Sequence, residues 1–250
     1  MLSSVQHIIS ILRLFRLDRP EMSLAQVSRY TGLPKSTTNK LLQTLVNMGF
    51  LEKVAERAHY RPSLQMFEMS HFILNHLALV QEAAPFIRHL AKQSGQVAHL
   101  TCYDKGEVTW LVKITHAHND HLYSRVGRRA PASIAASGKA VLAFLEVQEW
   151  LPTFESGWRR LTVKSNMDPN VLLRELDFVR KNGYSFQEEE VDLGVCSIGA
   201  PIFNERMRPI ASVSLAGHVN LFTTEMIKQY GRLTKHTALA ISERIGCRSN

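Results

Sequence analysis

Apolar residues in the first quarter of the chain recur at the spacing of amphipathic helices. The opening stripe predicts a helix that ends near residues 18–20, and it consists of Val5, Ile8, Ile9, Leu12 and Phe15. Ser23 and Gln26 have the spacing of a capping box, which predicts that a second, short helix begins at about Leu24. Gly32 is expected to end that helix, because glycine readily adopts the positive φ of a helix C-terminus.

A third helix follows almost at once, since Pro34 suits a first helical turn in which its missing amide hydrogen would have no partner. One stripe of this helix is expected to face a core, and it comprises Thr38, Leu41, Leu42, Leu45 and Val46. The opposite face has no Asp or Glu and carries Lys35, Ser36, Thr37, Asn39, Lys40, Gln43, Thr44 and Asn47. Residues 50–54 and 59–62 then read as two short strands around the tip at residues 55–58, which predicts a wing.

Two helices joined by a tight turn with a glycine, the second with an uncharged or cationic outer face, form the helix-turn-helix pattern. This pattern predicts a domain that binds double-stranded DNA. We expect base edges to be read by Ser36, Thr37, Asn39, Lys40 and Gln43. Phosphates are expected to be held by Lys35, Arg57 and Arg61.

The distribution of charge supports DNA binding by this segment. Residues 1–66 contain nine Lys or Arg and four Asp or Glu, a net charge of +5, whereas residues 67–250 contain 21 and 18, a net charge of +3. A helix-turn-helix match on its own also arises in ordinary helical domains. A basic charge concentrated in about a quarter of the chain is what phosphate neutralisation requires, and it favours the DNA-binding interpretation.

Residues 64–80 are apolar on nearly every face, which a lone surface helix should not be. Burial against the following domain would explain this, but a helix that connects two domains has little of its own chain to pack against. The pattern therefore favours a subunit interface. A homodimer or homotetramer also suits a DNA-binding protein, because paired recognition helices match two half-sites about one helical turn apart.

The remaining 170 residues alternate between helix and strand signals. Helices are expected at 81–94, 139–145, 168–182 and 224–245, and strands at 97–103, 108–114, 122–126, 184–187, 196–203 and 210–215. The strands are joined by short turns, as in an antiparallel sheet with helices packed on it. The whole chain is therefore predicted to be α+β.

Length and cysteine content narrow the class of protein further. A chain of 250 residues can form two ordinary domains, and the uneven charge favours two. The three cysteines form no CxxC pair, which argues against a disulfide framework or a zinc knuckle and favours a reducing cytoplasm. No apolar run reaches the roughly 18 residues that a bilayer span needs, and no cleavage site follows the apolar N-terminus, so no membrane partner is expected.

Four blocks of sequence, in order, resemble the IclR-type bacterial transcriptional regulators over almost the whole chain. They are GLPKSTTNKLLQTLVNMGFLEK, RRAPASIAASGKAVLAFL, DPNVLLRELDFVRKNGYSFQEEEVDLGVCSIGAPIF and RPIASVSLAGH. The resemblance implies a winged helix-turn-helix domain at 1–62, a linker helix at 63–80 and a GAF-like effector-binding domain at 81–250. It also implies assembly as a dimer or a dimer of dimers, and regulation of the kind that controls catabolic operons.

In such proteins a small metabolite, often a carboxylate, binds in the second domain and changes operator binding. Carried over by motif, the effector-binding residues would be Ala136, Ser137, Gln187, Val195, Ser197, Ser214 and Ala216. Amides at the start of the Ser137-Gly138 helix can receive an anion, and the three serine hydroxyls can orient it. At positions 187, 197 and 216 the residues depart from those frequent in the family, with Cys196 one place early, so the resemblance does not identify the effector.

Other chemistry in the sequence has simpler explanations. Ser137-Gly138-Lys139 lacks the first glycine and the final Ser or Thr of a phosphate loop. The cluster His116, His118, Asp120 and His121 has no regular metal-ligand spacing and is expected to be a solvated loop. Glu188, Glu189 and Glu190 are expected to form a solvated edge, Arg128 and Arg129 a loop surface, and Cys196 a buried apolar residue.

No catalytic constellation, metal site or cofactor is therefore predicted. Two alternatives to an effector-responsive regulator remain open at this stage. One is a small-molecule enzyme whose N-terminal module tethers or dimerises it, and the other is an architectural DNA-binding protein without an effector.

Overall fold

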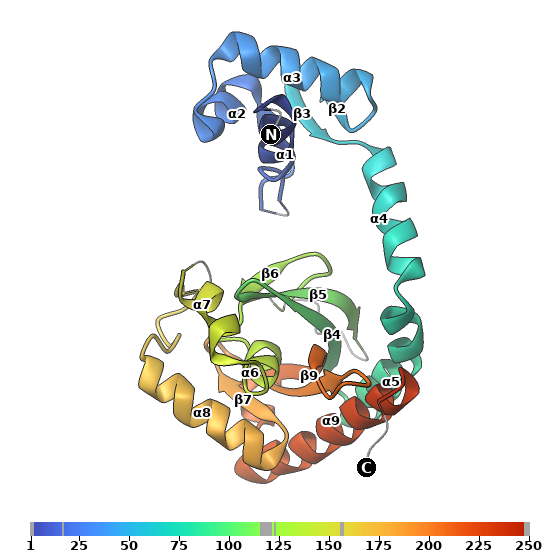
Figure 1. The fold of residues 1–250 in the computed structure, drawn as a ribbon, viewed down its shortest axis with the longest axis vertical. Helices are drawn as coiled ribbons and strands as arrows, with labels where there is room; N and C mark the ends of the chain where they lie inside the picture. The colour runs from blue at the N-terminus through green and yellow to red at the C-terminus, as the bar shows by residue number, and fades with distance from the viewer. Residues whose placement is uncertain (1–2, 17, 116–121, 123, 156–157, 248–250) are drawn as a thin grey trace. The chain divides into compact units, whose positions relative to one another are not determined.

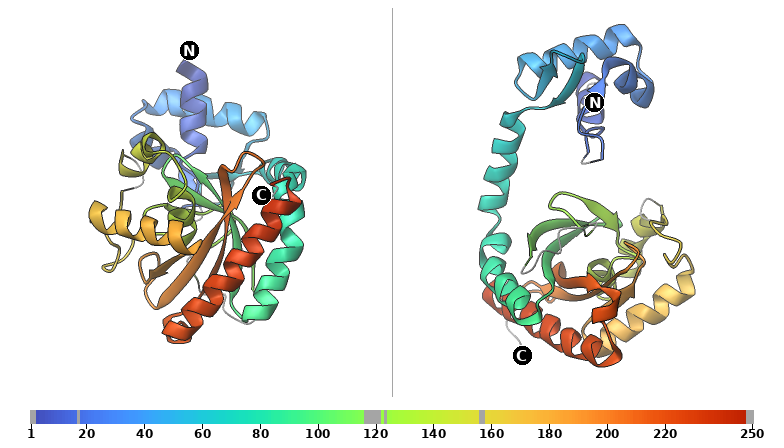
Figure 2. Two further views of the ribbon diagram at one scale, coloured as in Figure 1. Left: turned by 60° about the horizontal axis from the view of Figure 1, so that its bottom comes forward. Right: turned by 180° about the vertical axis from the view of Figure 1, so that it is seen from behind.

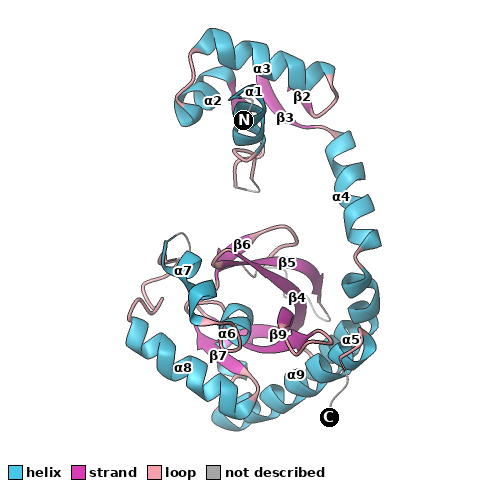
Figure 3. Cartoon of the chain, viewed as in Figure 1, coloured by secondary structure: helices cyan, strands magenta, loops and turns pink. Residues whose placement is uncertain are grey.

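The chain divides between His76 and Leu77 into two compact units, Met1–His76 and Leu77–Asn250. The computed structural model describes residues 3–16, 18–115, 122, 124–155 and 158–247. Figure 1 shows the elements of both units, and Figure 3 shows that strands and helices occur in each, so the predicted α+β class is confirmed.

The first unit packs helices against a small antiparallel sheet of order β1-β3-β2. Its elements are α1 (Ser3–Leu12), β1 (Met22–Ser23), α2 (Leu24–Thr31), α3 (Lys35–Asn47), β2 (Leu51–Val54), β3 (His59–Pro62) and α4 (Leu64–His76). One apolar core holds the unit together through Ile11, Met22, Val27, Leu42, Leu45, Leu51 and Tyr60. The predicted helices and the two wing strands are confirmed, although α1 ends earlier than predicted.

Local signals explain where α2 and α3 begin and end. The Ser23 hydroxyl accepts a hydrogen bond from the Gln26 backbone amide, and the Gln26 side-chain oxygen accepts one from the Ser23 backbone amide, so the capping box is confirmed. Gly32 ends α2 with a φ of 71°. Pro34 is the residue before α3 and not its first residue. Strand β1 was not predicted, because two residues are too short to show an alternating pattern.

The predicted helix over 64–80 is wrong at its C-terminal end. Helix α4 ends at His76 and α5 (Ala78–Ser94) begins one residue after Leu77, whose backbone is extended with φ −75° and ψ 99°. The apolar pattern continues through this break, so periodicity could not reveal it. In α4 the side chains of Leu64 and Phe67 are 70% and 64% exposed in the single chain.

The second unit is built on a six-stranded antiparallel sheet of order β6-β5-β4-β9-β8-β7. The strands are β4 (Val97–Asp104), β5 (Glu107–Ile114), β6 (Arg129–Pro131), β7 (Ser185–Glu188), β8 (Val195–Phe203) and β9 (Pro209–His218). Helices α5 and α9 (Thr224–Arg244) lie side by side and pack on one face of it (Figure 2). The other face carries α6 (Ala136–Leu142).

Residues of the central strands alternate between these two faces. On β4, Ala98 and Leu100 belong to the apolar core under α5 and α9, whereas His99 points to the other face. On β9, Val213 belongs to the same core, whereas Ser214 lies beside His99 in the strand register. One face of the sheet is therefore a core, and the other is polar enough to line a binding site.

Further elements cover the edge of the second unit around Trp110 and Trp150. They are α7 (Val147–Glu155) and α8 (Pro169–Asn182), whereas the short 3-10 helix η1 (Val219–Leu221) packs through Val219 against the core under α5 and α9. The predicted strand at 122–126 is wrong, since its described residues 122 and 124–126 form bends, turns and irregular backbone, and the next strand is β6. Helix α6 begins three residues before the predicted 139, and α7 was not predicted at all.

The first turn of α6 lies directly against the sheet backbone. A Cβ atom on Gly199 of β8 would lie 2.7 Å from the carbonyl carbon of Ala136, and one on Gly138 would lie 2.3 Å from Cα of Ala132. The hydroxyl of Ser185 donates to the Ala136 carbonyl (2.6 Å), and that of Ser212 donates to the Ser137 carbonyl (2.9 Å). Glycine and serine thus fix the start of α6 on β8 and β9.

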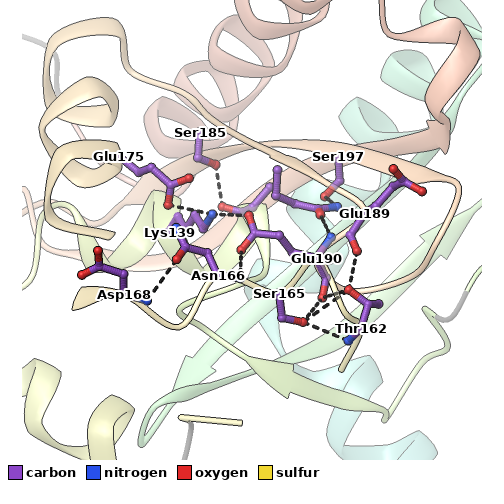
Figure 4. A network of polar contacts seen from close by, with 12 residues as sticks. Lys139, Thr162, Ser165, Asn166, Asp168, Glu175, Ser185, Glu189, Glu190 and Ser197 are labelled. Carbon is purple, nitrogen blue, oxygen red and sulfur yellow. Dashed lines mark hydrogen bonds and ion pairs between the residues drawn. The ribbon is translucent and has the colours of Figure 1, made fainter. Parts of the chain in front are cut away.

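A buried ion cluster holds the other side of α6 (Figure 4). Lys139 is fully buried, with Nζ 2.5 Å from Oε1 of Glu190 and 2.8 Å from Oε2 of Glu175 on α8. The second oxygen of Glu190 accepts the Asn166 amide (3.2 Å), and its carbonyl accepts the Ser165 hydroxyl (2.7 Å). Glu190 was predicted to be exposed to solvent, and this prediction is wrong. The side chain is buried because it is the carboxylate partner of the buried Lys139.

Replacement of Lys139 should strongly destabilise the second unit. Lys139→Met leaves the buried Glu190 carboxylate without its cationic partner and beside that of Glu175, and we expect a loss of about 3–5 kcal/mol in the free energy of unfolding. Urea denaturation followed by tryptophan fluorescence measures this, since Trp110, Trp150 and Trp158 all lie in the second unit. Lys164→Met is the control, because Lys164 pairs with Glu189 at the surface and its removal should cost far less stability. Equal stability of the two variants would contradict the role of the buried pair.

Candidate DNA-binding face and effector cavity

The polar side of α3 is open to solvent, as a DNA-reading surface requires. Of the predicted contact residues, Thr37 is half-buried and the exposed ones are Lys35, Ser36, Asn39, Lys40 and Gln43. Thr38 points inward and donates its hydroxyl to the Pro34 carbonyl (3.0 Å), so the helix turns its core stripe and its polar face in opposite directions. No acidic residue lies on α3.

The wing places its two predicted arginines in different surroundings. Arg57 lies exposed at the tip, where its carbonyl is 2.6 Å from Nδ1 of His59. Arg61 on β3 forms ion pairs with Glu52 and, at 3.4 Å, with Glu21, and the hydrogen bond to Glu52 raises the pKa of Arg61. Arg57 is thus available to a phosphate, whereas Arg61 would have to leave its carboxylate partners first.

A cavity opens between the polar face of the sheet and α6. The space inside it, counted out to its mouth, is about 410 Å³. The structure brings every predicted effector-binding residue to this cavity, namely Ala136, Ser137, Gln187, Val195, Ser197, Ser214 and Ala216. Residues that the sequence did not indicate complete the wall: His99, Trp110, Leu122, Ser124, Ala135, Val191 and Asp192.

Gln187 uses both ends of its amide within the protein. Its Nε2 donates to Oγ of Ser197 (2.8 Å), and its Oε1 accepts the Glu190 amide (2.8 Å). Gln187 therefore connects a hydroxyl of the cavity to the residue that pairs with Lys139. The hydroxyl hydrogen of Ser197 stays available for a ligand, since Ser197 acts as the acceptor in this contact.

His99 is the most deeply buried polar residue of the cavity wall, with 1% of its surface exposed. Its Nε2 is 2.8 Å from Oγ of Ser124, and its Nδ1 has no hydrogen-bond partner among the residues that the structure describes. Lys113 on β5 donates to the Ser124 carbonyl (2.9 Å) and stands behind this pair. Burial, with a smaller contribution from the Lys113 ammonium, lowers the pKa of His99 to about 3, so the ring is neutral at physiological pH.

Charge is scarce in the cavity wall. Among the described residues that line it, Asp192 is the one with a formal charge at neutral pH. The wall otherwise combines apolar side chains with the hydroxyls of Ser124, Ser137, Ser197 and Ser214. This composition suits a small organic molecule that is held by a few hydrogen bonds.

The described part of the chain adds no metal site or reactive thiol to these two sites. The predicted loop cluster at residues 116, 118, 120 and 121 lies outside the described residues, and the described ones contain no group of three metal-ligating side chains. Cys196 is buried, as predicted, and burial raises its pKa to about 12, so the thiol stays protonated. Within the described ranges, no helix is long and apolar enough to cross a membrane.

The burial of a neutral His99 should make stability depend on pH. Below its ordinary pKa of 6.5 the unfolded chain binds a proton at His99 and the folded chain does not, so the free energy of unfolding falls as the pH falls. Between about pH 7 and about pH 5 we expect His99 to account for a loss of roughly 2 kcal/mol. Urea denaturation at both pH values should show that loss in the parent chain and not in His99→Gln. The same pH dependence in both proteins would contradict a neutral, buried His99.

Comparison with known proteins finds the same two domains. A model of the IclR helix-turn-helix domain matches residues 4–55, and a model of the C-terminal domain of bacterial transcriptional regulators of the IclR type matches residues 71–243. The HTH-type transcriptional regulator KipR of Bacillus subtilis (strain 168) is 30% identical over 240 residues, which cover 95% of each chain.

Solved structures have the same fold. The crystal structure of the Thermotoga maritima IclR protein matches with a TM-score of 0.73 and 26% identity, and covers 98% of this chain and 100% of that one. An IclR homolog from Microbacterium hydrocarbonoxydans, crystallised with 4-hydroxybenzoate, matches with a TM-score of 0.83 and 21% identity, over 97% and 99% of the two chains. With both family domains matched in order, this chain belongs to the IclR family of DNA-binding transcriptional regulators.

Proposed function

We propose that this regulator binds operator DNA through α3 and the wing, and that a small metabolite in the cavity of the second unit controls the binding. The observation that carries the proposal is that residues from four separate segments, all indicated by the family motifs, line one cavity. Proteins of this family are regulators and not enzymes, so the alternative of a tethered enzyme is set aside. Control of a catabolic operon is part of the proposal.

Base reading is assigned to the exposed donors of α3. Lys40 and Gln43 lie one turn apart on its open face, and Ser36, Thr37 and Asn39 complete the reading surface. Phosphate contacts are assigned to Lys35 and Arg57, which are exposed at the start of α3 and at the wing tip. Arg61 can contact a phosphate only if its ion pair with Glu52 breaks, so its contribution to the DNA-binding free energy is expected to be smaller.

The effector is proposed to be a small carboxylate-like metabolite. Three serines line the cavity, and their hydroxyls can donate to the oxygens of such a metabolite. They are Ser137, Ser197 and Ser214. Helix α6 has seven residues, so its dipole is short and the serine hydroxyls carry more of this argument than the helix amides do. Gln187 is proposed to hold the wall in place, because its amide is already bonded at both ends.

A homodimer or homotetramer is proposed through α4. Leu64, Phe67 and Met69 are exposed on this helix in the single chain, which is costly for apolar side chains unless a second subunit covers them. The effector can then act by population shift, in which it binds one arrangement of the DNA-binding modules more tightly than another.

A titration of the purified protein against its own upstream DNA and a scrambled duplex, at several salt concentrations, tests the DNA-binding part. We expect at least roughly a thousandfold preference for the native fragment and a steep salt dependence. Metabolites that change this affinity, and that lose their effect in Ser197→Ala, would support the cavity as the effector site. Effectors that act equally on Ser197→Ala and on the parent chain would count against it.

Two substitutions should separate base reading from phosphate binding. Lys40→Ala is expected to lose about 1–3 kcal/mol of binding free energy on the operator and much less on the scrambled duplex. Arg57→Ala should weaken binding to both duplexes alike and reduce the salt slope by about one unit. Equal losses on both duplexes for Lys40→Ala would contradict its assignment as a base-reading residue.

A further inference from the structure

We propose that His99 determines the specificity of the cavity: its Nδ1 presents an N–H donor, and the effector carries an oxygen acceptor that binds to it. The inference rests on the proposed effector-binding function and deepens it, because it assigns a residue outside the family motifs and a chemical class to one end of the ligand. The acceptor can be the oxygen of a carboxylate, an amide or a ketone.

The position of His99 gives it access to the ligand. It lies in register with Ser214 of β9 and Lys113 of β5, on the face of the sheet that lines the cavity. Ser124, its hydrogen-bond partner, lines the same cavity. A buried polar atom without a partner is uncommon and costs about 1–3 kcal/mol. Among the described residues Nδ1 of His99 has no partner, and it belongs to a side chain that lines the cavity, so a small movement of the ring would bring it to a ligand.

The contact with Ser124 decides which ring nitrogen carries the proton. If Nε2 donated to Ser124, the serine hydroxyl hydrogen and the bare Nδ1 would both lack a partner within the described part of the chain. If the serine hydroxyl donates to Nε2, a single group, the Nδ1–H, is left without one. The second arrangement leaves fewer polar groups without a hydrogen-bond partner. The ring is therefore assigned as the Nδ1–H form, whose Nδ1 is a donor.

The surroundings of the ring favour an oxygen acceptor over a second donor. Lys113 places an ammonium group at the Ser124 carbonyl, next to the His99 pair, and a partial or full negative charge on the ligand is stabilised by it. The low pKa of His99 keeps the ring neutral, so the donor does not need an anionic partner to be satisfied. Trp110 packs edge-on against the ring, with 6.3 Å between centroids, and limits its rotation.

The proton assignment is testable without a ligand. Long-range proton–nitrogen NMR of the full chain, labelled with ¹⁵N-histidine, distinguishes the two neutral forms, and comparison with His99→Gln identifies the His99 signals. The expected spectrum has a protonated Nδ1 and a bare Nε2. A protonated Nε2 would overturn the proposal.

Ligand chemistry is tested with benzoate, benzamide and benzylamine, which share a ring and differ in the group they present. Benzoate and benzamide should shift the His99 Nδ1 signal and raise the melting temperature, and benzylamine should do neither. His99→Asn keeps an amide donor near the Nδ1 position, whereas His99→Gln reaches the Nε2 position. We therefore expect benzoate affinity to fall by roughly tenfold or more in His99→Gln and by much less in His99→Asn.

The outcomes separate this inference from the proposed function. Equal benzoate binding by His99→Gln and the parent chain would overturn the role of His99, as would the absence of any shift at its ring with benzoate and benzamide. Neither result affects the operator titration or the Ser197→Ala test. An effector that releases operator DNA equally from His99→Gln would leave the cavity as the effector site and remove only His99 from it.

Discussion

Burial of the Lys139 ammonium group is the constraint on which the structure of the second unit depends. An ammonium group without water is tolerated only beside opposite charge, so Glu175 of α8 and Glu190 of the turn after β7 have to lie against α6. The same turn carries Val191 and Asp192, which form part of the cavity wall. The buried Lys139 ammonium group therefore holds α6, α8 and one wall of the cavity together.

One face of the six-stranded sheet forms an apolar core, and the other face lines the cavity. Branched and small apolar residues of β4, β8 and β9 pack under α5 and α9, and several residues between them in sequence, among them His99, Ser197 and Ser214, line the cavity on the other face. Because side chains alternate along a strand, each strand serves both purposes at once. A shift of one residue in the register of β9 would bring Val213 into the cavity and Ser214 into the core.

Most of the elements could be predicted because their signals are local. The capping box at Ser23, the left-handed Gly32 and the Asp168-Pro169 start of α8 each depend on residues that are neighbours in sequence. The break at Leu77 left no such signal, since the apolar pattern runs through it. The burial of Glu190 was missed for a related reason, because its partner Lys139 is 51 residues away and only the fold brings them together.

The cavity was predictable to the extent that motifs mark it. The motif residues at 136, 137, 187, 195, 197, 214 and 216 all line it. Motifs could not indicate His99, whose role depends on Ser124 being held beside it. A test for alternation along β4 would have placed His99 on the same face as Thr101, and so on the polar side of the sheet. The identity of its partner required the structure.

The contact between α6 and the sheet limits how this cavity could be redesigned to sense another compound. A side chain at Gly138 or Gly199 would meet main-chain atoms, which cannot rotate away as the end of a side chain can. The spacing between α6 and the sheet is therefore fixed, and a biosensor built on this protein would have to be retuned through the side chains that line the cavity. Its larger apolar residues are Trp110, Leu122, Val191 and Val195, and replacing them with smaller ones is the route to a larger analyte.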